Sequence, residues 1–261
     1  MGNLNLLYEH WKKEHHFFER NLNKLKKTIT TKAVHDIRVC IKKMKAYRNL
    51  FYLLNTNESK IKFKQTNKLF DALGKLRNIH ICLELIEGHE KENNNNSYPE
   101  LNAFLNGKIK QTKSWSKKII KNYDDKELSE FELLLTDMPT DDQEELIGSK
   151  INSELKELEE IAYQPHEMRR GLKKVSYWIK TLPEEQAEQN YKTEKLNDVT
   201  DKLGSWQDSE ILLKDIRYFR KEFLPKSSEE NKRLKVLQNI IVEKKHSLND
   251  EALNKPDFVK K

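Results

Sequence analysis

One short stretch of the chain combines a histidine with regularly spaced cations. The stretch HDIRVCIKKMK begins at His35. At about 100° per residue, its cations Arg38, Lys42 and Lys45 form one stripe of a helix, opposite the apolar side chains. Like charges at helical spacing repel each other by roughly a few tenths of a kcal/mol per pair. A stripe made only of cations is therefore typical of a site for a multivalent anion.

A second stretch repeats this arrangement farther along the chain. HEMRRGLKKVSYW begins at His166, 131 residues after His35. Arg169 and Lys173 stand at the spacings of the first stretch, and Tyr177 extends the stripe. The two helices thus present the same face with the same spacing.

A second matched pair of segments supports a duplication. LGKLRN at 73–78 has a counterpart in LGSWQD at 203–208, an offset of 130 residues. Two matches at almost one offset, close to half of the 261-residue chain, predict a duplicated four-helix unit. We place the two units at residues 1–123 and 135–253, related by an approximate two-fold axis, in one compact domain spanning residues 1–261.

Helical periodicity dominates the rest of the chain. Seven Gly and six Pro leave few tight turns, and β-branched alternation is nearly absent, so we predict an all-α protein made of two four-helix bundles. Thr30 or Thr31 is placed to cap the second helix, and the Asn-rich run at 92–99 indicates a linker. The predicted helices cover residues 4–27, 31–54, 59–87, 98–122, 140–163, 165–182, 194–223 and 228–253, with one short helix in the connection at 121–142.

The overall charge restricts the partners of the chain only weakly. Lys and Arg number 49 against 42 Asp and Glu, a net charge of +7, so where the cations cluster matters more than their excess. Charges throughout the first 30 residues argue against a secretion signal, and no apolar run reaches the length of about 18 residues that a membrane span needs. Cys40 and Cys82 are the only cysteines, which fits a reducing cytoplasm. We expect a cytoplasmic protein that does not enter a membrane.

The two histidine stretches, with an LG segment downstream of each, resemble the CHAD domain, the conserved-histidine α-helical domain. The likeness covers nearly the whole chain, because that family is itself a tandem of two four-helix units. The resemblance implies two basic helices that face a shared central groove or pore and bind inorganic polyphosphate. It also implies a cytoplasmic protein that associates with polyphosphate granules.

The resemblance can be carried over residue by residue. Arg77 comes from the first LG segment, and Arg170 and Lys174 are cations beside the second motif. Several family arginines are lysines here, which keeps the charge but loses the bidentate fork, and Gln207 replaces an arginine of the second LG segment. The polyphosphate-binding residues that the resemblance implies are His35, Arg38, Lys42, Lys43, Lys45, Arg77, His166, Arg169, Arg170, Lys173, Lys174 and Tyr177.

Other functions fit parts of the sequence. Nucleic-acid binding needs the same cations and usually adds aromatic platforms, yet Tyr177 is the only aromatic residue within a stripe. A metal-dependent phosphohydrolase would need ligands, and His15, His16 and Glu19 share a helical face without forming a histidine pair at i, i+4. Packed or solvated histidines explain this set more simply. For the basic stripes, the simplest alternative to a binding site is a solvated face. We therefore expect non-catalytic binding of polyphosphate, with nucleic-acid binding as the alternative and with no metal and no cofactor.

The histidines of the two motifs give this hypothesis a pH dependence. An ordinary imidazole has a pKa of about 6.5 and gains charge more easily beside a polyanion. If His35 and His166 contact the ligand, affinity should rise as the pH falls through about 6 to 7.

Overall fold

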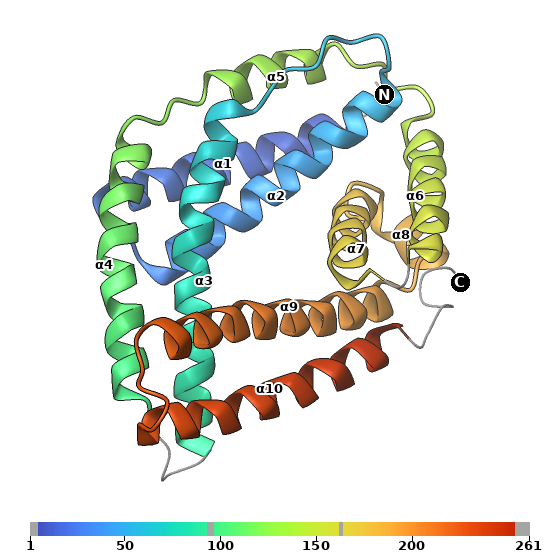
Figure 1. Cartoon of the computed structure of the whole chain (residues 1–261). Helices are drawn as coiled ribbons and strands as arrows, with labels where there is room; N and C mark the ends of the chain where they lie inside the picture. The colour runs from blue at the N-terminus through green and yellow to red at the C-terminus, as the bar shows by residue number, and fades with distance from the viewer. Residues whose placement is uncertain (1–4, 93–96, 162–163, 254–261) are drawn as a thin grey trace.

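The structure is a computed structural model that describes residues 5–92, 97–161 and 164–253 (Figure 1). All ten regular elements in these ranges are helices, which confirms the prediction of an all-α protein. No helix within them is both long enough and apolar enough to cross a bilayer. The helices are α1 (Leu6–Lys27), α2 (Thr31–Leu54), α3 (Lys64–Glu92), α4 (Pro99–Lys121), α5 (Lys126–Thr136), α6 (Gln143–Glu160), α7 (Pro165–Ile179), α8 (Glu184–Asn190), α9 (Thr193–Glu222) and α10 (Glu229–Leu253).

Most helix ends fall where the local sequence predicts them. The side chain of Thr30 caps α2 by accepting a hydrogen bond from the Ala33 N–H at 3.1 Å. Asn5 caps α1 in the same way, with the Tyr8 N–H as donor at 3.0 Å. Prolines open α4 and α7, where a missing N–H costs no helical hydrogen bond.

Helix α3 differs from its prediction at both ends. It begins five residues later than position 59 and continues past Gly88. Its first N–H groups are capped by the Glu127 carboxylate, which accepts from Gln65 at 3.2 Å and from Thr66 at 2.6 Å. Because this cap lies 61 residues from Thr66 along the chain, no local signal could have placed the start of the helix.

One helix, α8, is not among the predicted elements. None of its residues is buried, so no apolar periodicity marks it in the sequence. The second half of the chain consequently holds five helices, α6–α10, instead of four. The predicted end of α6 near residue 163 and the central part of the Asn-rich linker lie outside the described residues.

Two hydrophobic cores hold the helices together, and both halves of the chain contribute to each. The larger core is formed mainly by α1–α7 with the first turns of α9. The second core joins α3, α4, α9 and α10 through buried residues such as Ile86, Leu101, Leu213 and Leu234. Each such side chain contributes about 1.5–3 kcal/mol relative to an exposed one. The two halves thus share both cores, and their two-fold relation stays a prediction.

Four helices form a closed ring at the centre of the molecule (Figure 1). Helix α2 contacts α3, α3 contacts α9, α9 contacts α7, and α7 contacts α2. The contact between α7 and α2 includes a buried hydrogen bond, in which Trp178 Nε1 donates to the Ala46 carbonyl at 2.8 Å. This bond fixes the spacing of the two helices that carry the basic stripes.

Candidate functional site

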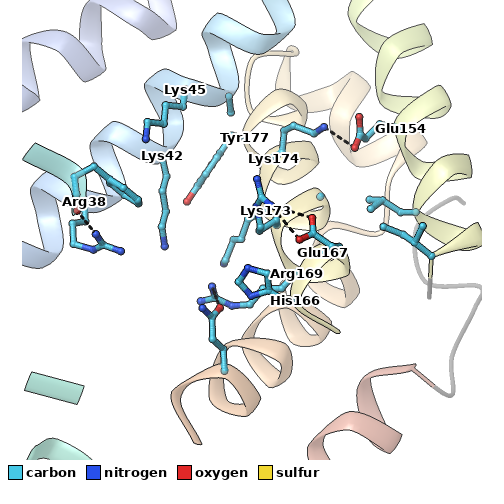
Figure 2. Close-up of a pocket in the computed structure, with 17 residues that line it drawn as sticks. Arg38, Lys42, Lys45, Glu154, His166, Glu167, Arg169, Lys173, Lys174 and Tyr177 are labelled. Carbon is cyan, nitrogen blue, oxygen red and sulfur yellow. Dashed lines mark hydrogen bonds and ion pairs between the residues drawn. The ribbon is translucent and has the colours of Figure 1, made fainter. Parts of the chain in front are cut away.

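A pocket of about 540 Å³ lies between the two basic helices (Figure 2). Arg38, Lys42 and Lys45 reach it from α2, and the second basic stripe faces them from α7. Phe70 of α3 and Gln207 of α9 complete the lining from the other two helices of the ring, and α6 closes one side. We call this space the central pocket.

The central pocket is strongly cationic. Its lining holds seven Lys or Arg side chains and two Glu, a net charge of +5 (7 − 2) from these nine residues. Nine of the twelve residues implied by the family resemblance lie on it. These are Arg38, Lys42, Lys45, His166, Arg169, Arg170, Lys173, Lys174 and Tyr177.

Four of the seven cations have no carboxylate partner within the part of the chain that the structure describes: Arg38, Lys42, Lys45 and Arg169. Arg38 Nη1 donates to the Phe70 carbonyl at 2.6 Å. Arg169 Nη1 donates to Gln207 Oε1 at 2.8 Å, while its buried Nε has no hydrogen-bond partner in the described ranges. Half-buried cations without an ion-pair partner are costly, so these positions are suited to an anionic ligand.

The other three pocket cations are partly neutralised by carboxylates. Their ion pairs are Arg170–Glu167 at 3.0 Å, Lys173–Asp201 at 3.5 Å and Lys174–Glu154 at 2.6 Å. Ion pairs with solvent access contribute about 0–1 kcal/mol. A polyanion can therefore displace the exposed carboxylates of Glu167 and Asp201 at low cost.

Burial and mutual repulsion lower the pKa values of the pocket cations. The pKa of Lys42 falls to about 8, first because the side chain is buried and then because Arg169 and Arg38 are positively charged. Burial also lowers the pKa of Lys45 to about 8, although Asp71 opposes the shift. For Arg38, burial lowers the pKa to about 10. A bound anion would favour the charged forms and raise these pKa values.

Two glycines of the LG segments lie against the pocket arginines. A Cβ at Gly74 would be only 2.5 Å from Arg38 Nη1, whereas a Cβ at Gly204 would be 3.5 Å from Arg169 Nη2. At the first distance, a Cβ at position 74 could be accommodated only if the Arg38 guanidinium moved. The second distance is an ordinary van der Waals contact. Each glycine thus meets an arginine of the neighbouring basic helix, a correspondence that the predicted repeat implies.

Three residues implied by the resemblance lie outside the central pocket. Lys43 forms an ion pair with Glu14 at 2.5 Å, because one further residue turns it by about 100° from the stripe, toward α1. Arg77 pairs with Glu84 at 2.9 Å on α3 itself. His35, at the start of α2, does not line the pocket either. The roles of these three residues in binding stay predictions from the resemblance, because they lie outside the lining of the central pocket.

The two motif histidines have different surroundings. His166 lines the central pocket. Partial burial lowers the pKa of His35, and the positive charge of Arg77 lowers it further. Any gain of charge by His35 therefore occurs below its ordinary pKa of about 6.5.

Phe70 is a pocket residue that the motifs do not reveal. Its ring lies 4.0 Å from the guanidinium of Arg38 and 4.2 Å from the ammonium of Lys45. Such cation–π contacts hold both cations in place. Phe70 precedes the first LG segment by three residues, and nothing local to it indicates a cation site.

Fold and pocket together define an all-α protein with a cationic pocket between two similar helices. The family profile of the CHAD domain matches residues 16–217, and the chain therefore belongs to the CHAD domain family. Among solved structures it is similar to the CHAD domain from the plant Ricinus communis, with a TM-score of 0.68 and 12% sequence identity over 95% of this chain and 90% of that one. No curated protein gives a significant match.

Proposed function

We propose that this protein binds inorganic polyphosphate in the central pocket without catalysing a reaction on it. The observation that carries the proposal is the set of four pocket cations, divided between α2 and α7, that form no ion pair with any described carboxylate. Polyphosphate offers regularly spaced charges and no base to read, so spaced cations suffice to bind it. Cations that neutralise such a chain also release its condensed counterions, which favours binding.

The pocket chemistry supports binding over catalysis. Both glutamates of the lining are already paired, Glu154 with Lys174 and Glu167 with Arg170. Neither is therefore poised as a general base. The membership in the CHAD family agrees with this function, and we propose a cytoplasmic location associated with polyphosphate granules.

Nucleic acid is the alternative polyanion, and the pocket aromatics do not favour it. Both cations that contact Phe70 lie over its ring, and Tyr177 is only 9% exposed. Neither ring is free to stack on a base. Competition between long-chain polyphosphate and single-stranded DNA, at equal phosphate concentration, tests the assignment. Displacement of bound DNA by polyphosphate supports it, and preference for the DNA would reject it.

Gly74→Ala is expected to weaken polyphosphate binding about three- to tenfold, because the new methyl group must displace the guanidinium of Arg38. Gly204→Ala is the matched control, since its Cβ fits beside Arg169 without a shift. Both changes replace a helical glycine and gain helix propensity of up to about 1 kcal/mol. Fluorescence anisotropy with labelled polyphosphate measures the affinities. Equal effects of the two substitutions would contradict the placement of Arg38.

Polyphosphate affinity is expected to fall as the pH rises through about 8. Lys42 and Lys45, each with a pKa of about 8, are charged below this pH and become neutral above it, and only the charged form attracts phosphate. Each lysine can reduce the affinity by up to about tenfold per pH unit until the raised pKa of the complex is reached.

Lys42→Arg provides the control for this pH dependence, because a guanidinium keeps its charge throughout the range. The variant should bind with a flatter profile between about pH 7 and 9 than the unmodified protein. Calorimetric titration in buffers of different ionisation enthalpy measures the protons taken up on binding. A profile that is flat for both proteins would show that these lysines do not contact the ligand.

A further inference from the structure

A second group of side chains lies around His15. Unlike the cationic stripes of α2 and α7, it combines a histidine with carboxylates. One ligand atom each from His15, Glu19 and Asp125 lies within 4.8 Å of the other two. His15 and Glu19 are one turn apart on α1, and Asp125 is the residue before α5. The sequence favoured a packed or solvated histidine here, because it offers no histidine pair at i, i+4.

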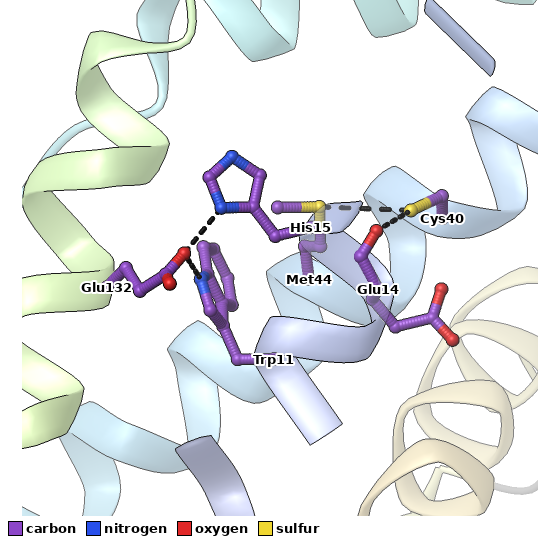
Figure 3. Close-up of polar contacts among 6 residues, drawn as sticks. All are labelled: Trp11, Glu14, His15, Cys40, Met44 and Glu132. Atoms are coloured by element: carbon purple, nitrogen blue, oxygen red, sulfur yellow. Dashed lines mark hydrogen bonds and ion pairs between the residues drawn. The ribbon is translucent and has the colours of Figure 1, made fainter. Parts of the chain in front are cut away.

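The imidazole of His15 is held in one orientation. Its Nδ1 lies 2.5 Å from Glu132 Oε2, and the same oxygen accepts a hydrogen bond from Trp11 Nε1 at 3.2 Å (Figure 3). A carboxylate at Nδ1 fixes the tautomer that leaves the lone pair on Nε2. This is the arrangement by which proteins orient histidines that bind metal ions.

The second nitrogen of this ring has no partner among the residues that the structure describes. His15 is 8% exposed, and its buried Nε2 makes no hydrogen bond. Figure 3 shows this nitrogen directed away from Glu132. A buried imidazole nitrogen without a partner is costly, because it has lost water and gained nothing in exchange. An ion held by Nε2 and the two neighbouring carboxylates would satisfy it.

Charge and space beside the cluster also favour a cation. A small pocket of about 120 Å³ borders Glu19 and Asp125, and its lining adds Asp124 and Lys26. Three carboxylates against one ammonium leave a net charge of −2 (1 − 3). No ion pair joins Lys26 to any of these acids among the described residues. The volume accommodates an ion with one or two waters.

We propose that His15, Glu19 and Asp125 bind a divalent transition-metal ion, with Zn²⁺ as the best match. Imidazole nitrogen and carboxylate oxygen are both zinc ligands, and water can supply the fourth position, whereas Mg²⁺ prefers oxygen donors only. Tetrahedral zinc ligands lie about 3.4 Å apart. The three donor atoms already lie within 4.8 Å of one another, and the side chains of Glu19 and Asp125, neither of them buried, would reach this spacing by rotation. The ion would link α1 to the start of α5.

The test is calorimetric titration of the full chain with Zn²⁺, without polyphosphate. We expect one ion per chain, a rise in the midpoint of thermal unfolding, and no comparable effect of Mg²⁺. Glu19→Gln and Asp125→Asn should each weaken Zn²⁺ binding at least about tenfold. Neither side chain is buried, so neither substitution endangers the fold.

Asp124→Asn is the matched control, because Asp124 borders the small pocket and is not one of the three ligands. The affinity of the Asp124→Asn variant for Zn²⁺ should stay within about threefold of the affinity of the unmodified protein. The ligand-field spectrum of bound Co²⁺ reports nitrogen and oxygen donors independently of affinity. The proposal is overturned if Zn²⁺ does not bind at one ion per chain, or if Glu19→Gln and Asp125→Asn bind it as tightly as Asp124→Asn does.

Discussion

Lys42→Gln and Lys173→Gln are each expected to weaken polyphosphate binding about 10- to 100-fold, and the double variant more than either. Lys42 faces the central pocket from α2 and Lys173 faces it from α7. A charge-assisted hydrogen bond contributes about 1.5–3 kcal/mol, and each 1.4 kcal/mol corresponds to a factor of ten. Anisotropy titrations with long-chain polyphosphate measure these affinities.

The neighbouring residue provides the control for this prediction. Lys43→Gln removes the same charge from the same helix, but Lys43 pairs with Glu14 and lies outside the pocket. The affinity of the Lys43→Gln variant for polyphosphate should stay within about threefold of the affinity of the unmodified protein. Equal losses from Lys42→Gln and Lys43→Gln would mean that net charge, not the pocket, governs binding.

Lys42→Gln should also raise the stability of the fold at pH 7. The folded state lowers the pKa of Lys42 to about 8, so the charged form is less favourable in the folded chain than in the unfolded one below that pH. Removal of the side chain's charge removes this cost. A variant that melts at a higher temperature and binds less tightly shows that the lost affinity does not come from misfolding.

Trp178→Ala is expected to lower the free energy of unfolding by about 3–5 kcal/mol. The side chain is fully buried at the contact of α7 with α2, where its Nε1 donates to the Ala46 carbonyl. The substitution leaves a large cavity and a carbonyl without a donor. Urea denaturation, followed by circular dichroism, measures the change from the transition midpoint.

Two further substitutions separate packing from hydrogen bonding at this contact. Trp178→Phe keeps most of the ring and loses the donor, so we expect a loss of about 1–3 kcal/mol. Trp115 is 39% exposed, and Trp115→Phe should change stability by no more than about 0.5 kcal/mol. Similar costs for Trp115→Phe and Trp178→Phe would contradict the role of the Ala46 bond.

The basic stripes could be predicted because they are local. Residues at 3, 4 and 7 positions apart share a helical face, whatever the helix packs against, and the spacing of Arg38, Lys42 and Lys45 thus indicated a common direction. The recurrence of the pattern in the second half of the chain indicated a second basic helix facing the same site. Arg169 and Lys173 of that helix line the central pocket.

The remaining features depend on contacts between distant parts of the chain. Phe70 orders two pocket cations from another helix, and the ion-pair partner of Lys43, Glu14, comes from α1. The start of α3 depends on Glu127, and α8 buries no residue that could mark it. The proposed ligand Asp125 meets His15 only once α1 and α5 have packed. Periodicity within one helix carries no information about such partners.

The salt dependence of polyphosphate binding tests the central claim most directly. Affinity should be measured between about 50 and 200 mM salt for the unmodified protein and for the double variant Lys42→Gln/Lys173→Gln. We predict saturable binding, with a logarithm of the association constant that falls linearly with the logarithm of the salt concentration. The magnitude of this slope should be smaller by about 1.4 in the double variant, or about 0.7 for each lost cation. An affinity that does not change with the salt concentration, or equal slopes for the two proteins, would contradict a polyphosphate site in the central pocket.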